Sequence, residues 1–228
     1  MHSGDGPDGD GEDTAGGDHY FTARPASADE RRSVRVRIAD RDVTVETAGG
    51  VFSPDHVDLG TQVLLRTVPA PPATGDLLDL GCGWGPVALT LALSSPQARV
   101  WAVDVNERAL DLVRRNAERL GAANVVAARP EDVPPDVRFA TLWSNPPVRI
   151  GKAALHDLLA AWLPRVAPDG DAWLVVGRNL GADPLHRWLA TDAPAGAGLG
   201  VTVDRVASAK GFRVLRVTSA GDVVRVTS

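Results

Sequence analysis

Three closely spaced glycines directly after a short apolar segment constrain the fold of this chain more than any other feature. Leu77–Leu80 reads as a buried strand, residues 81–85 are rich in glycine, and an apolar helix is expected over Val87–Leu93. Glycine lets the backbone turn sharply and lets a ligand approach it closely. The N-terminus of the helix that follows favours a negatively charged group. The pattern therefore predicts a ligand-binding turn between a strand and a helix.

The remainder of the chain alternates short apolar segments with amphipathic ones. Further strands are expected at Arg99–Val103, Val125–Ala128, Phe139–Ser144 and Ala172–Val176. Helices are expected over Glu107–Leu120, with Gly121 as its C-cap, over Ala153–Leu163 and over Pro184–Leu189, and a closing strand pair over Val201–Val206 and Phe212–Val217. Alternating strands and helices favour an α/β fold with a doubly wound, largely parallel sheet.

An arginine-rich segment before the glycine turn alternates between apolar and polar residues. Val34–Ile38 and the pair Val43 and Val45 flank a polar turn at Asp40–Asp42, which predicts a hairpin. Its outer face would be basic, with Arg31, Arg32, Arg35, Arg37 and Arg41. Such a face is either a solvated sheet edge or a surface that contacts phosphates, and the sequence leaves both interpretations open.

The charges divide the chain into an acidic tail and a nearly neutral body. The 228 residues have a net charge of −5, but residues 1–19 hold six acidic and no basic residues, which leaves 23 acidic against 24 basic residues. Residues 1–18 lack the apolar side chains needed to fold, so we expect a disordered tail there. The near-neutral body neither indicates nor excludes nucleic-acid binding.

The composition argues against several classes of protein. No apolar run is long enough to span a membrane, and the N-terminus has neither the basic nor the apolar region of a signal peptide. The single cysteine, Cys82, fits a reducing compartment and a small buried side chain better than a nucleophile. His156 and His186 are isolated, and no cluster of histidine, cysteine and aspartate has metal-ligand spacing. We therefore expect a cytoplasmic protein without a metal.

An acidic residue, Asp104, ends the strand that follows the glycine turn. A carboxylate at this position can accept hydrogen bonds from both ribose hydroxyls of a nucleoside. The dinucleotide fingerprint requires a glycine at its sixth position, where this chain has Pro86. Asp104 and the glycine turn together favour a nucleoside ligand other than NAD, and they disfavour a turn that merely packs tightly.

The fourth expected strand ends in Asn145-Pro146-Pro147. Proline keeps the residue before it extended and has no N–H of its own. The Asn145 side-chain oxygen and the Pro146 carbonyl would therefore form a stiff pair of hydrogen-bond acceptors beside the ligand crevice. The plainer interpretation is a turn that only ends a strand.

These motifs resemble the class I S-adenosylmethionine-dependent methyltransferases, whose first motif is Asp-Leu-Gly-Cys-Gly-x-Gly. The resemblance implies a Rossmann-like sheet of seven strands, mostly parallel, with a C-terminal antiparallel strand. It implies a cofactor site made of Asp79, Gly81, Gly83, Gly85, Asp104 and Asp132. Asp79 would lie near the methionine end, Asp104 at the ribose, and Asp132, with Glu131 as the alternative, on the adenine side.

The Asn-Pro-Pro motif resembles that of methyltransferases acting on planar amines, namely adenine N6, guanine N2 or the glutamine amide. Two acceptors would favour a pyramidal amine nitrogen, aim its lone pair at the sulfonium methyl and stabilise the positive charge that develops. In that family an aromatic residue follows the motif and would stack on a target base, whereas this chain has Val148.

Over residues 19–218 the chain resembles the RsmC/RlmG type of ribosomal RNA guanine-N2 methyltransferases. The shared motifs are His19-Tyr20-Phe21, Gly50-Val51-Phe52-Ser53, Asp58-Leu59-Gly60-Thr61, Ser144-Asn145-Pro146-Pro147 and Val176–Leu180. The resemblance implies that Asp58 and Thr61 touch the methionine end of the cofactor. It implies substrate contacts by Val148, Arg149 and Arg178. Many relatives have two tandem methyltransferase-like halves, and the resemblance implies that this chain corresponds to the catalytic one.

The activity implied is methylation of an exocyclic guanine amine (N2) of ribosomal RNA, of the 16S type, with Asn145, Pro146 and Pro147 as the catalytic residues. Ribosomal RNA or the small ribosomal subunit would be the partner, and the chain is expected to be a monomer. The alternatives are methylation of a protein glutamine amide or of a small molecule, and a non-catalytic RNA- or ribosome-binding module that keeps the cofactor site. The expected organisation is a tail over residues 1–18, a hairpin and cofactor-covering segment over 19–60, and a methyltransferase domain over 61–228.

Overall fold

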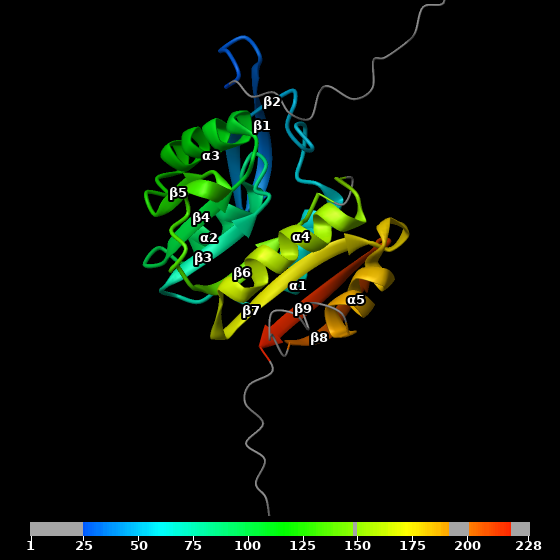
Figure 1. Cartoon of the computed structure of the whole chain (residues 1–228). Coiled ribbons are helices and arrows are strands. Elements are labelled where there is room, and N and C mark those ends of the chain that lie inside the picture. The colour runs from blue at the N-terminus through cyan, green and yellow to red at the C-terminus, as the bar shows by residue number, and fades with distance from the viewer. Residues whose placement is uncertain (1–24, 148–149, 192–200, 220–228) are drawn as a thin grey trace, which may run out of the picture.

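The computed structural model describes residues 25–147, 150–191 and 201–219. Within these residues, a seven-stranded sheet is covered by helices, and a two-stranded hairpin stands beside one end of it (Figure 1). The strands lie in the order β5 (Val125–Ala128), β4 (Arg99–Val103), β3 (Asp76–Leu80), β6 (Phe139–Ser144), β7 (Val166–Gly177), β9 (Phe212–Ser219) and β8 (Val201–Ala209). Neighbours from β5 to β7 pair in parallel, and β9 is antiparallel to β7 and β8. The prediction of a doubly wound, mostly parallel sheet with a C-terminal antiparallel strand is confirmed.

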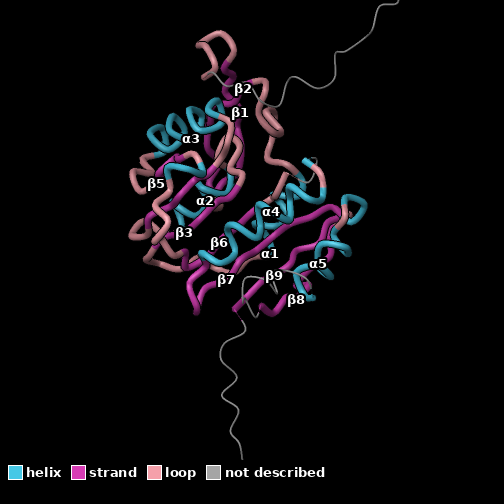
Figure 2. Tube along the Cα trace, in the orientation of Figure 1, coloured by secondary structure: helices cyan, strands magenta, loops and turns pink. Residues whose placement is uncertain are grey.

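The helices divide between the two faces of this sheet (Figure 2). The helices α1 (Leu59–Thr67), α2 (Pro86–Ser94) and α3 (Glu107–Leu120) pack on one face, and α4 (Lys152–Trp162) and α5 (Ala182–Thr191) on the other. Short 3-10 turns occur at η1 (Pro130–Asp132), η3 (Leu163–Arg165) and η4 (Arg178–Leu180). Leu77 packs under the first group of helices and its neighbour Leu78 under the second, because successive strand residues point to opposite faces. This double covering explains why the central strands are continuously apolar.

The predicted hairpin is present as β1 (Arg31–Ile38) and β2 (Arg41–Ala48), with Val34 opposite Val45. The fully buried Asn116 of α3 fixes it to the body of the protein. Asn116 Oδ1 accepts from the Glu46 N–H at 2.7 Å, and its Nδ2 donates to the carbonyls of Glu46 at 2.9 Å and Trp84 at 3.2 Å. One side chain therefore connects the hairpin, α3 and the glycine turn.

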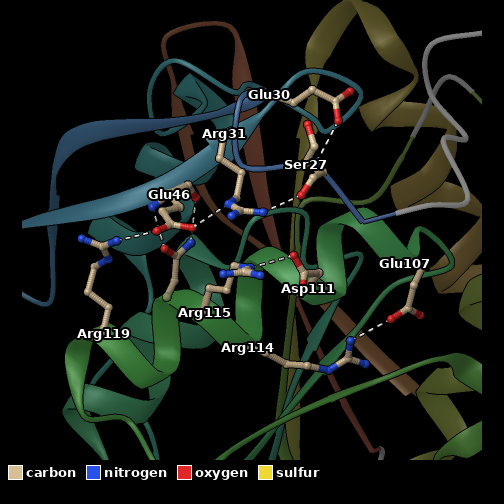
Figure 3. Close-up of polar contacts among 11 residues, drawn as sticks. Ser27, Glu30, Arg31, Glu46, Glu107, Asp111, Arg114, Arg115 and Arg119 are labelled. Carbon is tan, nitrogen blue, oxygen red and sulfur yellow. Dashed lines mark hydrogen bonds and ion pairs between the residues drawn. The ribbon is translucent and has the colours of Figure 1, made fainter.

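Ion pairs surround this connection (Figure 3). Glu46 meets both Arg31 and Arg119, and Arg115 Nε lies 2.9 Å from the Asp111 carboxylate one helical turn away. On the outer face of the hairpin, Arg32 pairs with Asp55, and Arg37 lies within 4 Å of Asp40 and Asp42. Carboxylates thus neutralise much of the arginine-rich face, which favours its interpretation as a solvated edge.

Two elements differ from the sequence-based expectation. The strand expected at Ala172–Val176 begins earlier, at Val166, because a register shift between Phe139 and Thr141 of β6 accommodates Pro168 and Gly170. A Cβ at Gly170 would lie 2.8 Å from the Ala140 carbonyl oxygen, so only glycine fits there. The second difference is α1, which the sequence analysis does not predict. Residues 1–18, the expected tail, and the motif at 19–21 lie outside the described residues.

The strand order reverses at β3, because β4 and β5 extend the sheet on one side and β6 and β7 on the other. In open α/β sheets, ligands bind outside the carboxyl ends of the strands at such a point. We call this end of the sheet, where β3, β6 and β7 end and β9 begins, the carboxyl edge. Ser144 Oγ donates to the Leu80 carbonyl at 2.6 Å, so the ends of β6 and β3 are held side by side.

Candidate active site

The glycine turn wraps around the end of β4. The N–H groups of Gly81 and Cys82 donate to the Val103 carbonyl at 2.8 and 3.0 Å. Gly81, Gly83 and Gly85 have φ of +77°, +54° and +98°, values that L-residues with side chains rarely adopt. Glycine is therefore needed at all three positions, and the backbone of Gly81 and Gly83 is left open toward the crevice.

Asp104 braces this turn from the end of β4. Its Oδ2 accepts from the Gly83 N–H and its Oδ1 from the Asn106 N–H, both at 2.9 Å. Burial raises the pKa of Asp104, and these backbone donors oppose the rise. The next residue, Val105, is 54% exposed, so an apolar side chain also faces solvent at this strand end. The sequence places Asp104 correctly but gives no indication of Val105.

Asp79 is buried beneath the turn with an exposed fraction of 1%. Its Oδ2 accepts from the Ala88 N–H in the first turn of α2 at 2.8 Å. Burial raises the pKa of Asp79 to about 8, and the charge of Asp104 adds to the rise. Among the residues that the structure describes, no cation pairs with Asp79. A positively charged ligand group would therefore find a carboxyl group without a counter-charge here.

The side chains within the turn are structural. Cys82 is buried, and burial together with the Asp104 and Asp79 charges raises the pKa of its thiol well above the ordinary value. A thiol in this environment stays protonated, which agrees with its interpretation as a small packing residue. Trp84 is also buried, and its Nε1 donates to the Ser53 carbonyl at 3.1 Å. Trp84 thereby holds the segment before α1 against the turn.

Asn145 leaves β6 next to this turn, and α1 orients its side chain. Asn145 Nδ2 donates to Asp58 Oδ2 at 2.9 Å and to Thr61 Oγ1 at 3.1 Å. A carboxylate can only accept hydrogen bonds, so the nitrogen of the amide faces Asp58 and the oxygen points elsewhere. Within residues 25–147, 150–191 and 201–219, no group donates to Asn145 Oδ1 or to the Pro146 carbonyl. Among these residues, the two acceptors predicted from the sequence therefore have no donor.

The same Asp58 is the N-cap of α1. Its Oδ2 accepts from the N–H groups of Gly60 at 2.8 Å and Thr61 at 3.2 Å. An aspartate before Leu59 is a recognised helix-start signal, and it could have identified α1 in the sequence. Gly60 also matters because a Cβ there would lie 2.8 Å from Phe212 Cε1 and 2.9 Å from Asp58 Oδ2. The close approach of β9 to the start of α1 therefore requires glycine.

A pocket of about 360 Å³, including the part open to solvent, lies between the glycine turn, the start of α1 and Asn145. Of the residues predicted from the sequence, its lining contains Asp58, Thr61, Asp79, Gly81, Gly83 and Asn145. Gly85, Asp104, Pro146, Pro147 and Arg178 do not line it. Asp132 is exposed in η1, away from the lining, and its role stays a prediction. Val148 and Arg149 lie outside the described residues.

Phe52 is a pocket residue to which the sequence analysis assigns no role. Its side chain is 42% exposed and lines the pocket together with Asn145. The segment that carries it is held on both sides of Phe52, since Asn106 Nδ2 donates to the Gly50 carbonyl and Trp84 Nε1 to the Ser53 carbonyl. A large apolar ring that is exposed on a segment held in this way is the feature that could have identified Phe52 as a residue that contacts a ligand.

Residues 42–216 match the methyltransferase small domain family. This match covers more than half of the 228 residues. The chain belongs to this methyltransferase family. It is a class I methyltransferase of the RsmC-like type that takes its methyl group from S-adenosylmethionine.

The sequence of the chain is also similar to those of several other proteins. The methyltransferase is 32% identical to the uncharacterized protein YbxB of Bacillus subtilis over 168 residues, 72% of this chain and 84% of that protein. It is 38% identical to Ribosomal RNA small subunit methyltransferase C of Aeromonas hydrophila over 132 residues, 57% of this chain and 37% of that protein. Several further proteins of the same name, including that of Klebsiella pneumoniae, match at a similar level.

A solved structure shows the same fold. The T. thermophilus 16S rRNA N2 methyltransferase (RsmC), in complex with AdoMet and guanosine, superposes with a TM-score of 0.65 at 25% identity. The match covers 83% of this chain and 50% of that one. The methyltransferase thus spans half or less of the three named rRNA methyltransferases.

The described part of the chain lacks two further features. None of its helices is long and apolar enough to cross a membrane. It contains no group of three or more histidine, cysteine, aspartate or glutamate side chains placed to hold a metal ion.

Proposed function

We propose that this methyltransferase acts on the exocyclic N2 amine of a guanine in 16S ribosomal RNA, as a monomer and in the cytoplasm. The orientation of Asn145 carries the proposal, because Asp58 and Thr61 engage its Nδ2 and leave Oδ1 as an acceptor beside the pocket. The Pro146 carbonyl is the second acceptor. An amine with two N–H groups fits this pair, whereas a hydroxyl or a ring nitrogen does not.

The cofactor would occupy the pocket and the adjoining end of β4. Gly81, Gly83 and Gly85 let it approach the backbone, Asp104 takes the ribose hydroxyls, and Asp79 takes the ammonium group of the methionine. Asp58 and Thr61 lie at the methionine end, and Asp132 contacts the adenine side. The donor set fits, because the uncompensated Asp79 carboxyl group and the open glycine backbone suit a nucleoside with a cationic chain. S-Adenosylmethionine supplies an electrophilic methyl group on a sulfonium.

The residues of the chain position the amine and stabilise charge. When Asn145 Oδ1 and the Pro146 carbonyl accept its two N–H bonds, the nitrogen becomes pyramidal and its lone pair points toward the cofactor. The lone pair forms the N–C bond as the S–C bond breaks, and the two acceptors stabilise the positive charge on nitrogen. The proton that N2 then loses goes to water. No side chain with the pKa of a strong base is needed.

Phe52 would supply the aromatic ring that position 148 lacks. Its exposed side chain shares the pocket with Asn145, and an aromatic face can stack on a flipped-out base. Stacking contributes about 1–3 kcal/mol per base, which corresponds to roughly 5- to 150-fold in affinity. Phe52→Ala should therefore raise the KM for RNA within this range, and Phe52→Trp should retain it.

Ribosomal RNA is favoured over a protein or a small molecule by the named relatives. Ribosomal RNA small subunit methyltransferase C of Aeromonas hydrophila shares 38% identity, and the T. thermophilus RsmC structure holds guanosine. The deciding assay is transfer of labelled methyl from S-adenosylmethionine to small ribosomal subunits, free 16S rRNA and release factors in parallel, with nucleoside mass analysis. N2-methylguanosine in either RNA sample supports the proposal, and label in release factors alone contradicts it.

Asn145→Ala tests the mechanism in the same assay. The methylation rate should fall by about 10²- to 10³-fold, the usual loss for one hydrogen-bond partner of the transition state. Affinity for S-adenosylhomocysteine should stay within about twofold, because Asp58 keeps its bonds to Gly60 and Thr61. Undiminished turnover in this variant would refute the amine-acceptor mechanism. A wild-type chain that methylates none of the substrates would be a non-catalytic binding module.

A further inference from the structure

The turn between β8 and β9 lies at the carboxyl edge, although it is far from the glycine turn in sequence. Because β9 is antiparallel to β7, its first residue, Phe212, pairs with Gly177 at the carboxyl end of β7. The Arg178 N–H donates to the Gly211 carbonyl at 2.7 Å and joins η4 to the turn. A second pocket, of about 400 Å³ including open solvent, is found here, and its lining includes Arg178, Lys210 and Arg213.

Lys210 has a backbone conformation that a lysine seldom adopts. Ala209 pairs with Phe212, so Lys210 and Gly211 form a two-residue hairpin turn with φ of +50° and +82°. Turns of this kind favour asparagine, aspartate or glycine at the first position, because a left-handed φ strains longer side chains. Only two lysines occur in the chain, Lys152 and Lys210. A residue of low turn propensity at the edge of a pocket motivates the hypothesis of a functional contact.

The cations of this turn lack the carboxylate partners found elsewhere in the molecule. In the described residues, the exposed side chains of Arg178 and Lys210 form no ion pair or hydrogen bond. Arg205 and Arg213 share the single carboxylate of Asp183. We call Arg178, Arg205, Lys210 and Arg213 the cation cluster. Among the described residues it has one carboxylate partner, Asp183, and Arg178 and Lys210 are free to meet a ligand.

Packing places this cluster next to the residues that orient Asn145. The Phe212 ring lies against Gly60, where an added Cβ would come within 2.8 Å of Phe212 Cε1. Asp58, the N-cap of α1, and Thr61, in its first turn, lie on either side of Gly60 in the sequence and hold the Asn145 amide. A chain bound with one unit at Asn145 would thus pass over the start of α1 and reach Arg178 and Lys210.

From this arrangement we propose that Arg178 and Lys210, with Arg213 behind them, bind backbone phosphates of the RNA strand next to the methylated nucleotide. The proposal rests on the proposed function, since it takes RNA as the substrate. Guanidinium and ammonium groups bind phosphate oxygens and fix the register of a strand without reading its sequence. The Ser208 hydroxyl, in the same pocket, is a further donor. S-Adenosylmethionine contains no phosphate, so the cofactor does not account for this charge.

The test compares the RNA binding of two double variants, each of which replaces two positively charged residues by neutral ones. Arg178→Gln with Lys210→Asn removes both free cations, and asparagine is favoured in the left-handed turn, so the fold is retained. Arg35→Gln with Arg41→Gln is the matched control, because it removes the same charge from exposed hairpin positions without an ion pair in the described residues. Affinity for a 16S rRNA transcript is measured from about 50 to 400 mM salt. Affinity for S-adenosylhomocysteine is measured in parallel.

The Arg178/Lys210 variant should bind RNA about 25-fold more weakly at 0.1 M salt. Each contact to a single strand contributes a slope of about −0.7 in log K against log salt, or roughly 5-fold at that concentration, so the slope should fall by about 1.4. The control and the cofactor affinity should be unchanged. Equal RNA binding by the two double variants would overturn the proposal, and a loss of cofactor affinity in the first would assign these residues to the cofactor carboxylate instead. Binding requires no turnover, so this result is independent of whether RNA is methylated.

Discussion

The hairpin–α3 region and the carboxyl edge differ in whether their charged side chains have partners of opposite charge. Around α3, Arg31, Arg115 and Arg119 each meet a carboxylate (Figure 3). At the carboxyl edge, Asp79 has no cation and Lys210 no anion among the described residues. The difference teaches that paired charges connect parts of the protein, whereas unpaired charged or titratable groups that lie beside a pocket are the ones that can meet a ligand. The carboxyl group at the edge can lose its proton to meet a cationic cofactor, and the cationic part suits phosphate.

The largest effect should come from breaking the polar connection of the first region. Asn116→Ala removes hydrogen bonds to buried backbone groups of Glu46 and Trp84, and should lower the free energy of unfolding by about 3 kcal/mol. This corresponds to a fall in Tm of roughly 6–12 °C for a domain of this size. Calorimetry measures this fall in Tm. Arg115→Ala, on the same helix, is the control and should leave the Tm almost unchanged, because its pair with Asp111 is exposed. Equal losses would mean that the ion pairs, and not Asn116, hold this region.

A smaller effect is expected from Asp79→Asn at the carboxyl edge. Loss of a buried carboxylate from the site of a cationic group should weaken S-adenosylhomocysteine binding by about 10- to 100-fold at pH 8, as measured by titration calorimetry. Wild-type affinity should rise with pH toward 8, where Asp79 loses its proton, and the variant should lack this rise. Equal affinity of the two proteins at pH 8 would show that Asp79 does not meet the ammonium group.

The raised pKa of Asp79 also predicts how the free energy of unfolding depends on pH. The pKa of Asp79 is about 8 in the folded chain and 3.8 in its ordinary state, so between these values the folded state binds a proton that the unfolded state has lost. The free energy of unfolding therefore falls as pH rises from about 4 to 8, and stays level above 8 as far as this group is concerned. Asp79→Asn should reduce this fall and stabilise the protein at pH 8, as measured by denaturant unfolding. An unchanged pH dependence would contradict the raised pKa.

Most strands and helices could be predicted from the sequence, because local features determine them. The apolar spacing of α3 and the left-handed Gly121 that ends it are both local signals. Helix α1 is not predicted from the sequence, because Gly60 in its first turn lowers helix propensity and the run Val63–Leu65 has no clear period. The early start of β7 depends on a register shift in the neighbouring strand, which no local pattern reveals.

In the site, the residues at strand ends could be predicted and the contacts between distant segments could not. Topology requires that Asp104 and Asn145 both lie at the carboxyl edge. The partners that orient Asn145, Asp58 and Thr61, are 87 and 84 residues away in sequence. The direction of the Asn145 oxygen is therefore a result of tertiary packing.

The left-handed conformation of Lys210 has a consequence for protein engineering. Asparagine or glycine at this position relieves strain and should raise thermal stability. A laboratory selection that rewards survival of heating alone will therefore favour replacement of a residue that we propose binds RNA. The evolved enzymes would tolerate heat better and would need lower ionic strength, or more substrate, to work at the original rate.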